Sequence, residues 1–194
     1  MNLKRWLYLF WTTLALGAGC ALIAGEILKL SQGTGFKNTA DFFIYMGILM
    51  GVGIMVSVYS QMGFFAYLMM NYMGTGVFSR RTWQYVQLVL TALALLELMF
   101  FRIFVSGESG DNKDIILGVI ILLVAAAVAY FKVKATNPNA WIPTLFFMIA
   151  GTIIEMVGVL KIQVNFATTL ILVPLIACNA YQILLLHKLV KKSA

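Results

Sequence analysis

The sequence has few charged residues and very few acids. Only 11% of its 194 residues are charged and seven are Asp or Glu, whereas 62% are hydrophobic and the mean hydropathy is +0.93. Soluble domains are about 45–50% apolar and about 25% charged. This composition leaves too little polar surface to cover a water-soluble globule, so it predicts an integral membrane protein.

Side chains that hold metals and cofactors are also scarce. The chain has one histidine, His187, and two cysteines, Cys20 and Cys178, which lie in apolar runs without any ligand spacing. The phosphate-binding loop GxxxxGK[ST], the zinc motif HExxH and the nucleophile motif GxSxG are all missing. We therefore expect no metal, no cofactor and no enzymatic activity, and we interpret the cysteines as small packing residues.

Long apolar runs are abundant. A membrane-spanning helix needs about 20 mostly apolar residues, and apolar sequence continues past Cys20 to Leu30, beyond the ~7–15-residue core of a signal peptide, so the first run is expected to be retained. The pattern predicts an all-α fold, a single six-helix transmembrane domain over residues 1–194. The six expected spans are 7–27, 42–72, 83–105, 115–131, 141–160 and 166–186.

The charges predict the orientation of these spans. With both termini in the cytoplasm, nine positive residues face the cytosol and five face outward, and the loop acids all lie outside, which agrees with the positive-inside rule. The net charge of +7 then reflects mainly the topology of the spans and secondarily an attraction to anionic lipid headgroups. Nucleic-acid binding is not needed to explain it. The cytosolic set is Lys4, Arg5, Arg80, Arg81, Lys132, Lys134, Lys188, Lys191 and Lys192, and the outer set is Lys29, Lys37, Arg102, Lys113 and Lys161.

The second apolar run is too long for one ordinary span. From Phe42 to Met73 it has 32 residues without a formal charge, which would make a straight helix of about 48 Å across a hydrocarbon core of ~30 Å. Two full spans would each be short and would turn Arg80 and Arg81 outward. We therefore predict one overlong helix.

One side of this helix combines polar and small residues. Helical periodicity places the polar and aromatic members of this set on one side, which is too polar for lipid tails, and the glycines permit close approach of helices. The side either packs against other helices of the chain or lines a binding or partner surface. Its members are Ser57, Gln61, Phe64, Asn71, Gly47, Gly51 and Gly63.

The same run holds seven of the eleven methionines. Methionine is unbranched and adapts to irregular neighbours, so these side chains either fill the membrane core or form an adaptable docking surface for another transmembrane protein.

Three short motifs resemble one protein family. They are SQMGFFAYL at Ser60–Leu68, Trp83 followed by VQ at 86–87, and Glu97 followed by FR at 101–102. This combination is similar to the KinB-signalling pathway activation family, small polytopic membrane proteins of spore-forming bacilli. The resemblance implies that the chain helps a membrane sensor histidine kinase feed the sporulation phosphorelay. Glu97 stands where the family pattern has an aspartate. Glutamate keeps the negative charge but has a side chain that is longer by one methylene group.

Ionisable residues inside apolar runs form a second candidate site. A charge at the centre of a membrane helix costs about 2.5–3.5 kcal/mol or more, so such residues pair or serve a function. By helical rise these residues converge on the outer leaflet, where they form an interhelical salt bridge, an outward-facing polar pocket or part of an ion path. The residues are Glu97, Glu155, Arg102, Glu26 and Lys161.

Two functions follow from these observations. The favoured one is a non-enzymatic accessory protein of the bacterial cell membrane that activates a sensor histidine kinase by lateral helix contacts. The alternative is a small transporter or a receptor for a lipid or small molecule at the outer polar site. Besides the kinase, the expected partners are membrane lipids, and self-association stays open.

Overall fold

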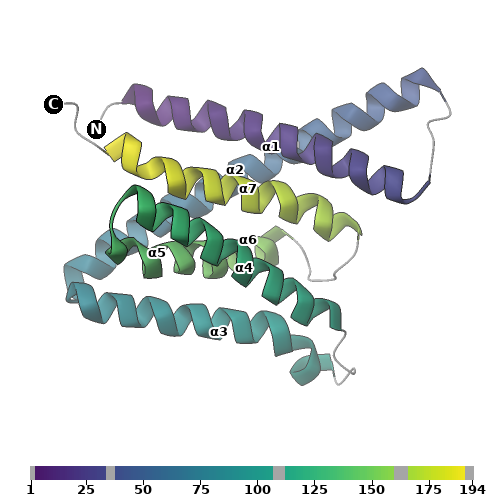
Figure 1. The fold of residues 1–194 in the computed structure, drawn as a ribbon. Coiled ribbons are helices and arrows are strands. Elements are labelled where there is room, and N and C mark those ends of the chain that lie inside the picture. The colour runs from purple at the N-terminus through teal and green to yellow at the C-terminus, as the bar shows by residue number, and fades with distance from the viewer. Residues whose placement is uncertain (1–2, 34–37, 107–111, 160–165, 191–194) are drawn as a thin grey trace. The chain divides into compact units, whose positions relative to one another are not determined.

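The computed structural model describes the backbone of residues 3–33, 38–106, 112–159 and 166–190, and the side chains of 4–33, 38–100, 115–156 and 168–189. All regular structure in these ranges is helical (Figure 1). Six of the described helical segments are long and apolar enough to cross a membrane, which confirms the predicted number of long apolar helices.

The observed helices extend beyond most of the predicted spans, because the polar residues at the ends of each apolar run continue the helix. The fifth span is the composite one, built from η1, α5, η2 and α6. The elements are α1 (Leu3–Ser31), α2 (Thr39–Val77), α3 (Arg80–Ser106), α4 (Asn112–Ala135), η1 (Pro138–Ala140), α5 (Trp141–Phe146), η2 (Phe147–Gly151), α6 (Thr152–Val159) and α7 (Phe166–Val190).

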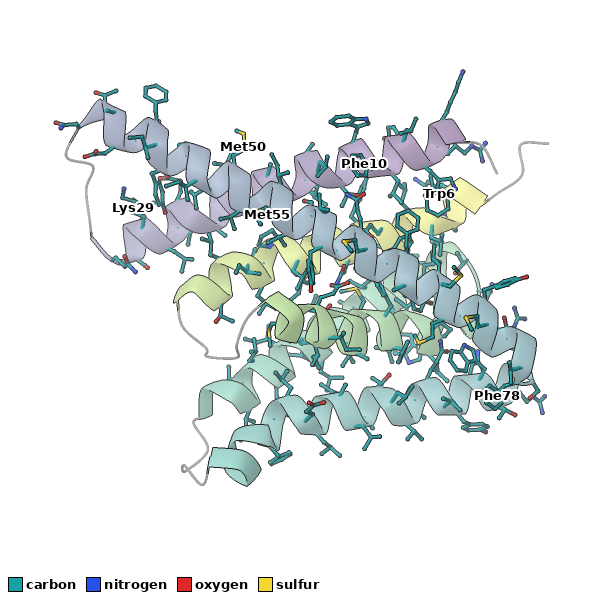
Figure 2. All side chains as sticks on the ribbon, turned by 180° about the vertical axis from the view of Figure 1, so that it is seen from behind. Trp6, Phe10, Lys29, Met50, Met55 and Phe78 are labelled. Atoms are coloured by element: carbon teal, nitrogen blue, oxygen red, sulfur yellow. The ribbon has the colours of Figure 1, made fainter. Side chains whose placement is uncertain are left out.

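Helix α2 is one uninterrupted helix, as the sequence predicts. It has 39 residues, which corresponds to about 58 Å at ~1.5 Å per residue, against a hydrocarbon core of ~30 Å. Its side chains include Met50 and Met55, and Phe78 follows its last turn (Figure 2). The glycines within it do not interrupt the helix.

The fifth span contains a π-helical turn that the sequence did not indicate. Pro143 lies in the first turn of α5, where a missing N–H is tolerated because it would have no partner within the helix. The next turn widens over Phe147–Gly151 into a π-helix. Such insertions are rare and often lie next to functional sites.

The chain divides into two compact units, one of residues 1–62 with 160–194 and one of residues 63–159. In the first unit, α1 and α7 pack side by side (Figure 1), and α1 meets α2 through glycine. A Cβ atom added to Gly53 would lie 2.5 Å from the carbonyl oxygen of Gly17 and 2.7 Å from Cα of Ala18. The two backbones are therefore in direct contact, as small-residue interfaces in membranes permit.

Polar side chains bond across this first unit. The Ser57 hydroxyl lies 2.8 Å from the carbonyl oxygen of Gly53 in its own helix and 3.1 Å from that of Thr13 in α1. Ser60 donates to Asn179 Oδ1 at 2.6 Å and accepts from Gln182 Nε2 at 2.9 Å. Since α2 thereby bonds to both α1 and α7, its rotation in this unit is specified by hydrogen bonds as well as by shape.

The second unit is centred on aromatic packing between α2 and the π-helical turn. The rings of Phe64 and Phe147 are 5.5 Å apart between centroids, and those of Tyr67 and Phe147 are 4.8 Å apart. Phe64, Phe147 and the nearby Met156 are almost completely buried. Aromatic pairs at these separations stabilise a contact by about 0.5–1.5 kcal/mol beyond the area they bury.

Gly47 and Gly51, two of the glycines predicted to pack against another helix, do not contact a described helix. A Cβ atom at Gly47 or Gly51 would meet no described atom within 4 Å, and both residues are exposed. The GxxxG spacing is therefore not used for contact with the described helices of the chain. The close approach takes place at Gly53, which is two residues after Gly51 and therefore on a different face of α2.

This difference predicts contrasting effects of single methyl groups. Gly53→Ala should lower the thermal midpoint of the purified protein in detergent, because overpacking of this kind costs about 1–3 kcal/mol. Gly51→Ala, the matched control on the same helix, should leave the midpoint unchanged or raise it, since alanine favours a helix over glycine by about 1 kcal/mol. Equal effects of the two substitutions would contradict the described contact.

Candidate functional site

The corner between α2 and α3 is the most elaborate polar feature of the second unit. Only two residues separate the helices, and Ser79 caps the start of α3 by accepting a hydrogen bond from the backbone N–H of Thr82 at 3.3 Å. Phe78 N–H donates to the carbonyl oxygen of Gly74 at 2.9 Å and extends the end of α2. Serine is among the preferred N-cap residues, which explains where α3 begins.

Trp83 fills the inside of this corner. Its indole packs directly on Gly74, where a Cβ atom would overlap the ring. The ring of Phe78 stacks beside it, with centroids 6.2 Å apart and planes 6° from parallel. Trp83 Nε1 donates to Asn71 Oδ1 at 2.9 Å, so the polar atom of the indole is satisfied although the residue is buried.

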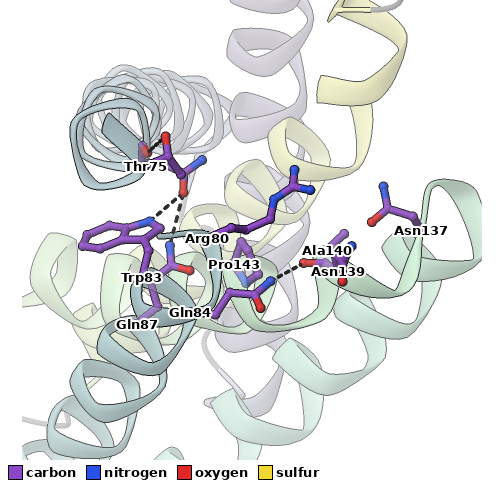
Figure 3. Close-up of a pocket in the computed structure, with 10 residues that line it drawn as sticks. Thr75, Arg80, Trp83, Gln84, Gln87, Asn137, Asn139, Ala140 and Pro143 are labelled. Carbon is purple, nitrogen blue, oxygen red and sulfur yellow. Dashed lines mark hydrogen bonds between the residues drawn. The ribbon is translucent and has the colours of Figure 1, made fainter. Parts of the chain in front are cut away.

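On one side of Trp83 lies a polar pocket of about 220 Å³ (Figure 3). Gln84 Nε2 donates to the carbonyl oxygen of Asn139 at 3.2 Å and ties α3 to η1 across the pocket. Most of the wall consists of side chains that can donate or accept hydrogen bonds. The lining residues are Asn71, Thr75, Arg80, Trp83, Gln84, Gln87, Asn137, Asn139, Ala140 and Pro143.

Gln87 is the most deeply buried polar residue of this wall, with 0% of its surface exposed. Its Nε2 donates to Asn71 Oδ1 at 3.4 Å, the oxygen that also accepts from Trp83. Its Oε1 accepts no hydrogen bond within the described part of the chain. An unsatisfied buried amide oxygen costs about 1–3 kcal/mol and calls for an explanation.

On the other side of Trp83 lies an open apolar groove of about 490 Å³, which we call the methionine groove. Met69 and Met73 are more than half exposed, and Val77 at the end of α2 is more exposed still. The groove contains no ionisable side chain. It is lined by Ala66, Met69, Met70, Met73, Gly74, Val77, Phe78 and Trp83.

The two carboxylates predicted to lie inside apolar helices, Glu97 and Glu155, have different environments. Glu155 is buried on α6 and packs on Gly63 of α2, where a Cβ atom would overlap the carboxylate. The two residues line a cleft of about 170 Å³ next to the π-helical turn. Glu97 is exposed on α3 and therefore does not share this buried position.

The structure leaves the rest of the predicted outer polar site untested. Glu26 is half-buried on α1 and belongs to the first unit. Lys161 and the side chain of Arg102 lie outside the described residues. The expected pairing of Glu97 or Glu155 with Arg102 or Lys161 thus stays a prediction.

The polar side of α2 faces other helices of the chain. Ser57 bonds to α1, and Gln61 Nε2 donates to the carbonyl oxygen of Phe10, also on α1, at 3.4 Å. Phe64 packs on the π-helical turn, and Asn71 holds Trp83. These four residues are therefore engaged within the chain, whereas the exposed methionines lie on the open faces of the helix.

Sequence reasoning missed the polar pocket. Its residues come from the ends of three apolar runs, where amide side chains are usually interpreted as polar caps of membrane spans. The cluster of Gln84, Gln87, Asn137 and Asn139, with Trp83 and Arg80, was visible as a local excess of amides. Only packing shows that these residues share a cavity.

The double role of Asn71 predicts a large effect of its removal. Asn71→Leu leaves Trp83 Nε1 and Gln87 Nε2 without their acceptor, so it should lower the denaturation midpoint in detergent, with a cost of about 1–3 kcal/mol. Thr75→Val is the control on the same face, because the Thr75 hydroxyl bonds only to carbonyl oxygens of its own helix and is exposed. A midpoint of Asn71→Leu equal to that of the control would show that the amide does not organise the corner.

Comparison with known proteins assigns the chain to a family. The family described as KinB-signalling pathway activation in sporulation (KbaA) matches residues 17–189. The chain is also 32% identical over 189 residues to the KinB-signaling pathway activation protein of Bacillus subtilis (strain 168), covering 94% of this chain and 96% of that protein. No solved structure matches the chain significantly. Because the family match covers residues 17–189 and the relative is matched over nearly its whole length, the chain belongs to the KbaA family.

Proposed function

We propose that this protein activates the KinB signalling pathway of sporulation as an integral membrane accessory protein, by lateral contact with the transmembrane helices of the sensor histidine kinase. Family membership is the observation that carries this proposal, because the match covers nearly the whole chain. The relative is named for activation of the KinB signalling pathway, and the alignment with this chain covers 96% of its length.

The proposed membrane location rests on the six long apolar helices and on the distribution of charge. Nine of the fourteen lysines and arginines fall on the side of both termini in this topology, as expected for cytoplasmic segments. The bacterial cell membrane is then the compartment, and the protein crosses it six times.

We assign no catalytic step to the protein. The sequence lacks the nucleophile, metal and phosphate-binding motifs that such a step would need. An activator without chemistry must act by changing the conformational equilibrium of its partner, which requires only a difference in binding free energy between two kinase states.

The methionine groove is the best candidate for the contact with the kinase. It is concave and apolar, and flexible thioether side chains can fit the surface of an incoming helix. Gly74 is covered by the Trp83 indole, so the open part of the groove lies over the exposed side chains of Met69, Met73 and Val77. The groove lies near the C-terminal end of the overlong α2.

The topology is testable by cysteine labelling in a variant in which Cys20 and Cys178 are replaced by alanine. Single cysteines introduced at Arg80 and at Ser193 should react with a membrane-impermeant maleimide only after the cells are permeabilised, because both positions are assigned to the cytosol. Gln32→Cys, in the turn after α1, should react in intact cells and serves as the control. Labelling of positions 80 and 193 from opposite sides would refute the topology.

The groove is testable by filling it. Met69→Trp with Met73→Trp should block an incoming helix and lower KinB-dependent reporter expression, since losing about 1 kcal/mol of helix contact weakens association about fivefold. Met50→Trp with Met55→Trp is the matched control, as these methionines are exposed on the same helix outside the groove. Protein levels in the membrane should be equal in both variants.

A photo-crosslinking amino acid at position 73 should also form an adduct with the kinase in cells, whereas the same group at position 55 should not. Normal signalling by the filled variant, together with no adduct from position 73, would exclude the groove as the contact surface. Loss of signalling on deletion of the whole protein would still support the pathway assignment.

A further inference from the structure

The polar pocket beside Trp83 has features of a built binding site. Its walls come from the end of α2, the start of α3, and the η1–α5 segment, and all three lie at ends of candidate membrane spans. Hydrogen bonds from Trp83 to Asn71 and from Gln84 to Asn139 hold these walls in place without a ligand. If the spans cross the bilayer, the pocket lies at the level of the lipid headgroups.

The electrostatic character of the pocket favours an anion. Among the described residues that line it, Arg80 is the one that carries a charge, and none is acidic. Arg80 is also the first residue of α3, a helix of 27 residues whose N-terminal N–H groups carry partial positive charge. A positive side chain is unfavourable at that end of a helix, so an anion would relieve a repulsion as well as form a new contact.

The buried amide of Gln87 adds a requirement for a hydrogen-bond donor. Its Oε1 is an acceptor without a partner in the described structure, and the residue forms part of the pocket wall (Figure 3). A bare anion has no hydrogen to give to this oxygen. A ligand that carries hydroxyl groups beside its anionic group would satisfy both Arg80 and Gln87.

The size of the pocket limits the ligand. A volume of about 220 Å³ is below the ~300–1,000 Å³ of sites for drug-sized molecules. It corresponds to about seven waters at ~30 Å³ each, which suits one small polar group.

We propose that this pocket binds a glycerol phosphate group, with the phosphate on Arg80 and the start of α3 and a hydroxyl donating to Gln87 Oε1. Two sources offer this chemistry, the headgroup of phosphatidylglycerol and free sn-glycerol 3-phosphate. The proposal does not depend on the kinase contact, because binding is measured on the purified protein alone.

The test uses the full-length protein in nanodiscs of phosphatidylcholine, whose headgroup has a phosphate but no hydroxyl donor. Including phosphatidylglycerol, or adding sn-glycerol 3-phosphate, should raise the thermal midpoint, and native mass spectrometry should show retained phosphatidylglycerol. A response to the lipid alone identifies the headgroup as the source, and a response to the soluble compound identifies the free phosphate ester. Either response supports the pocket.

Variants distinguish the pocket from general surface charge. Arg80→Gln should weaken the ligand response about tenfold or more, as expected for loss of a charge-assisted hydrogen bond. Arg81→Gln removes the same charge one residue away, outside the pocket lining, and should keep the response. Gln87→Met, which keeps the side-chain length without the oxygen, should weaken the response while the ligand-free protein stays folded.

Three results would overturn the proposal. Equal losses in Arg80→Gln and Arg81→Gln would mean that the anion is held by surface charge. An equal response to sulfate, an anion that carries no hydroxyl group at neutral pH, and to sn-glycerol 3-phosphate would remove the role of the hydroxyl donor. No response of the wild-type protein to either glycerol phosphate source would exclude the site, whether or not Gln87→Met folds.

Discussion

Hydrogen bonds made by polar side chains of otherwise apolar helices govern the rest of this structure. Hydrocarbon offers no hydrogen-bond partner, so a spanning backbone must be helical and its polar side chains must find partners within the protein. Helix α2 meets this constraint with serine, glutamine and asparagine along one side, each bonded to a neighbouring helix or side chain within its own unit. These bonds specify the rotation of α2 in both units and therefore specify which faces stay open.

Trp83 connects the two surface features of the second unit. Trp83 lines both the amide-rich polar pocket and the apolar methionine groove. Gly74 allows the ring to lie flat on α2, and Asn71 fixes it through Nε1. The groove proposed for the kinase and the pocket proposed for glycerol phosphate thus share a wall whose position depends on one hydrogen bond.

Much of the helical architecture was predictable because it depends on local properties. The six apolar runs follow from composition. The continuity of the helix over residues 39–77 follows from a long stretch without charged residues, which in a membrane can only be helical. The glycines show the limit of such reasoning. The sequence does not distinguish Gly47, Gly51 and Gly53 from one another. Of these three, only Gly53 faces α1, on the side of α2 from which Ser57 bonds to Thr13 of α1. Similarly, Glu97 and Glu155 look equivalent along the chain, yet only Glu155 is buried.

The sequence by itself therefore determined the all-helical class, the number of long apolar helices and the family, since each depends on residue type and order alone. Tertiary structure decided which polar residues share a cavity, which methionines remain exposed and where the π-helical turn falls. The physical reason is that these properties depend on how each helix is rotated against its neighbours. That rotation results from many weak contacts between residues far apart in the chain, and helical periodicity defines the faces of a helix without saying what each face will meet.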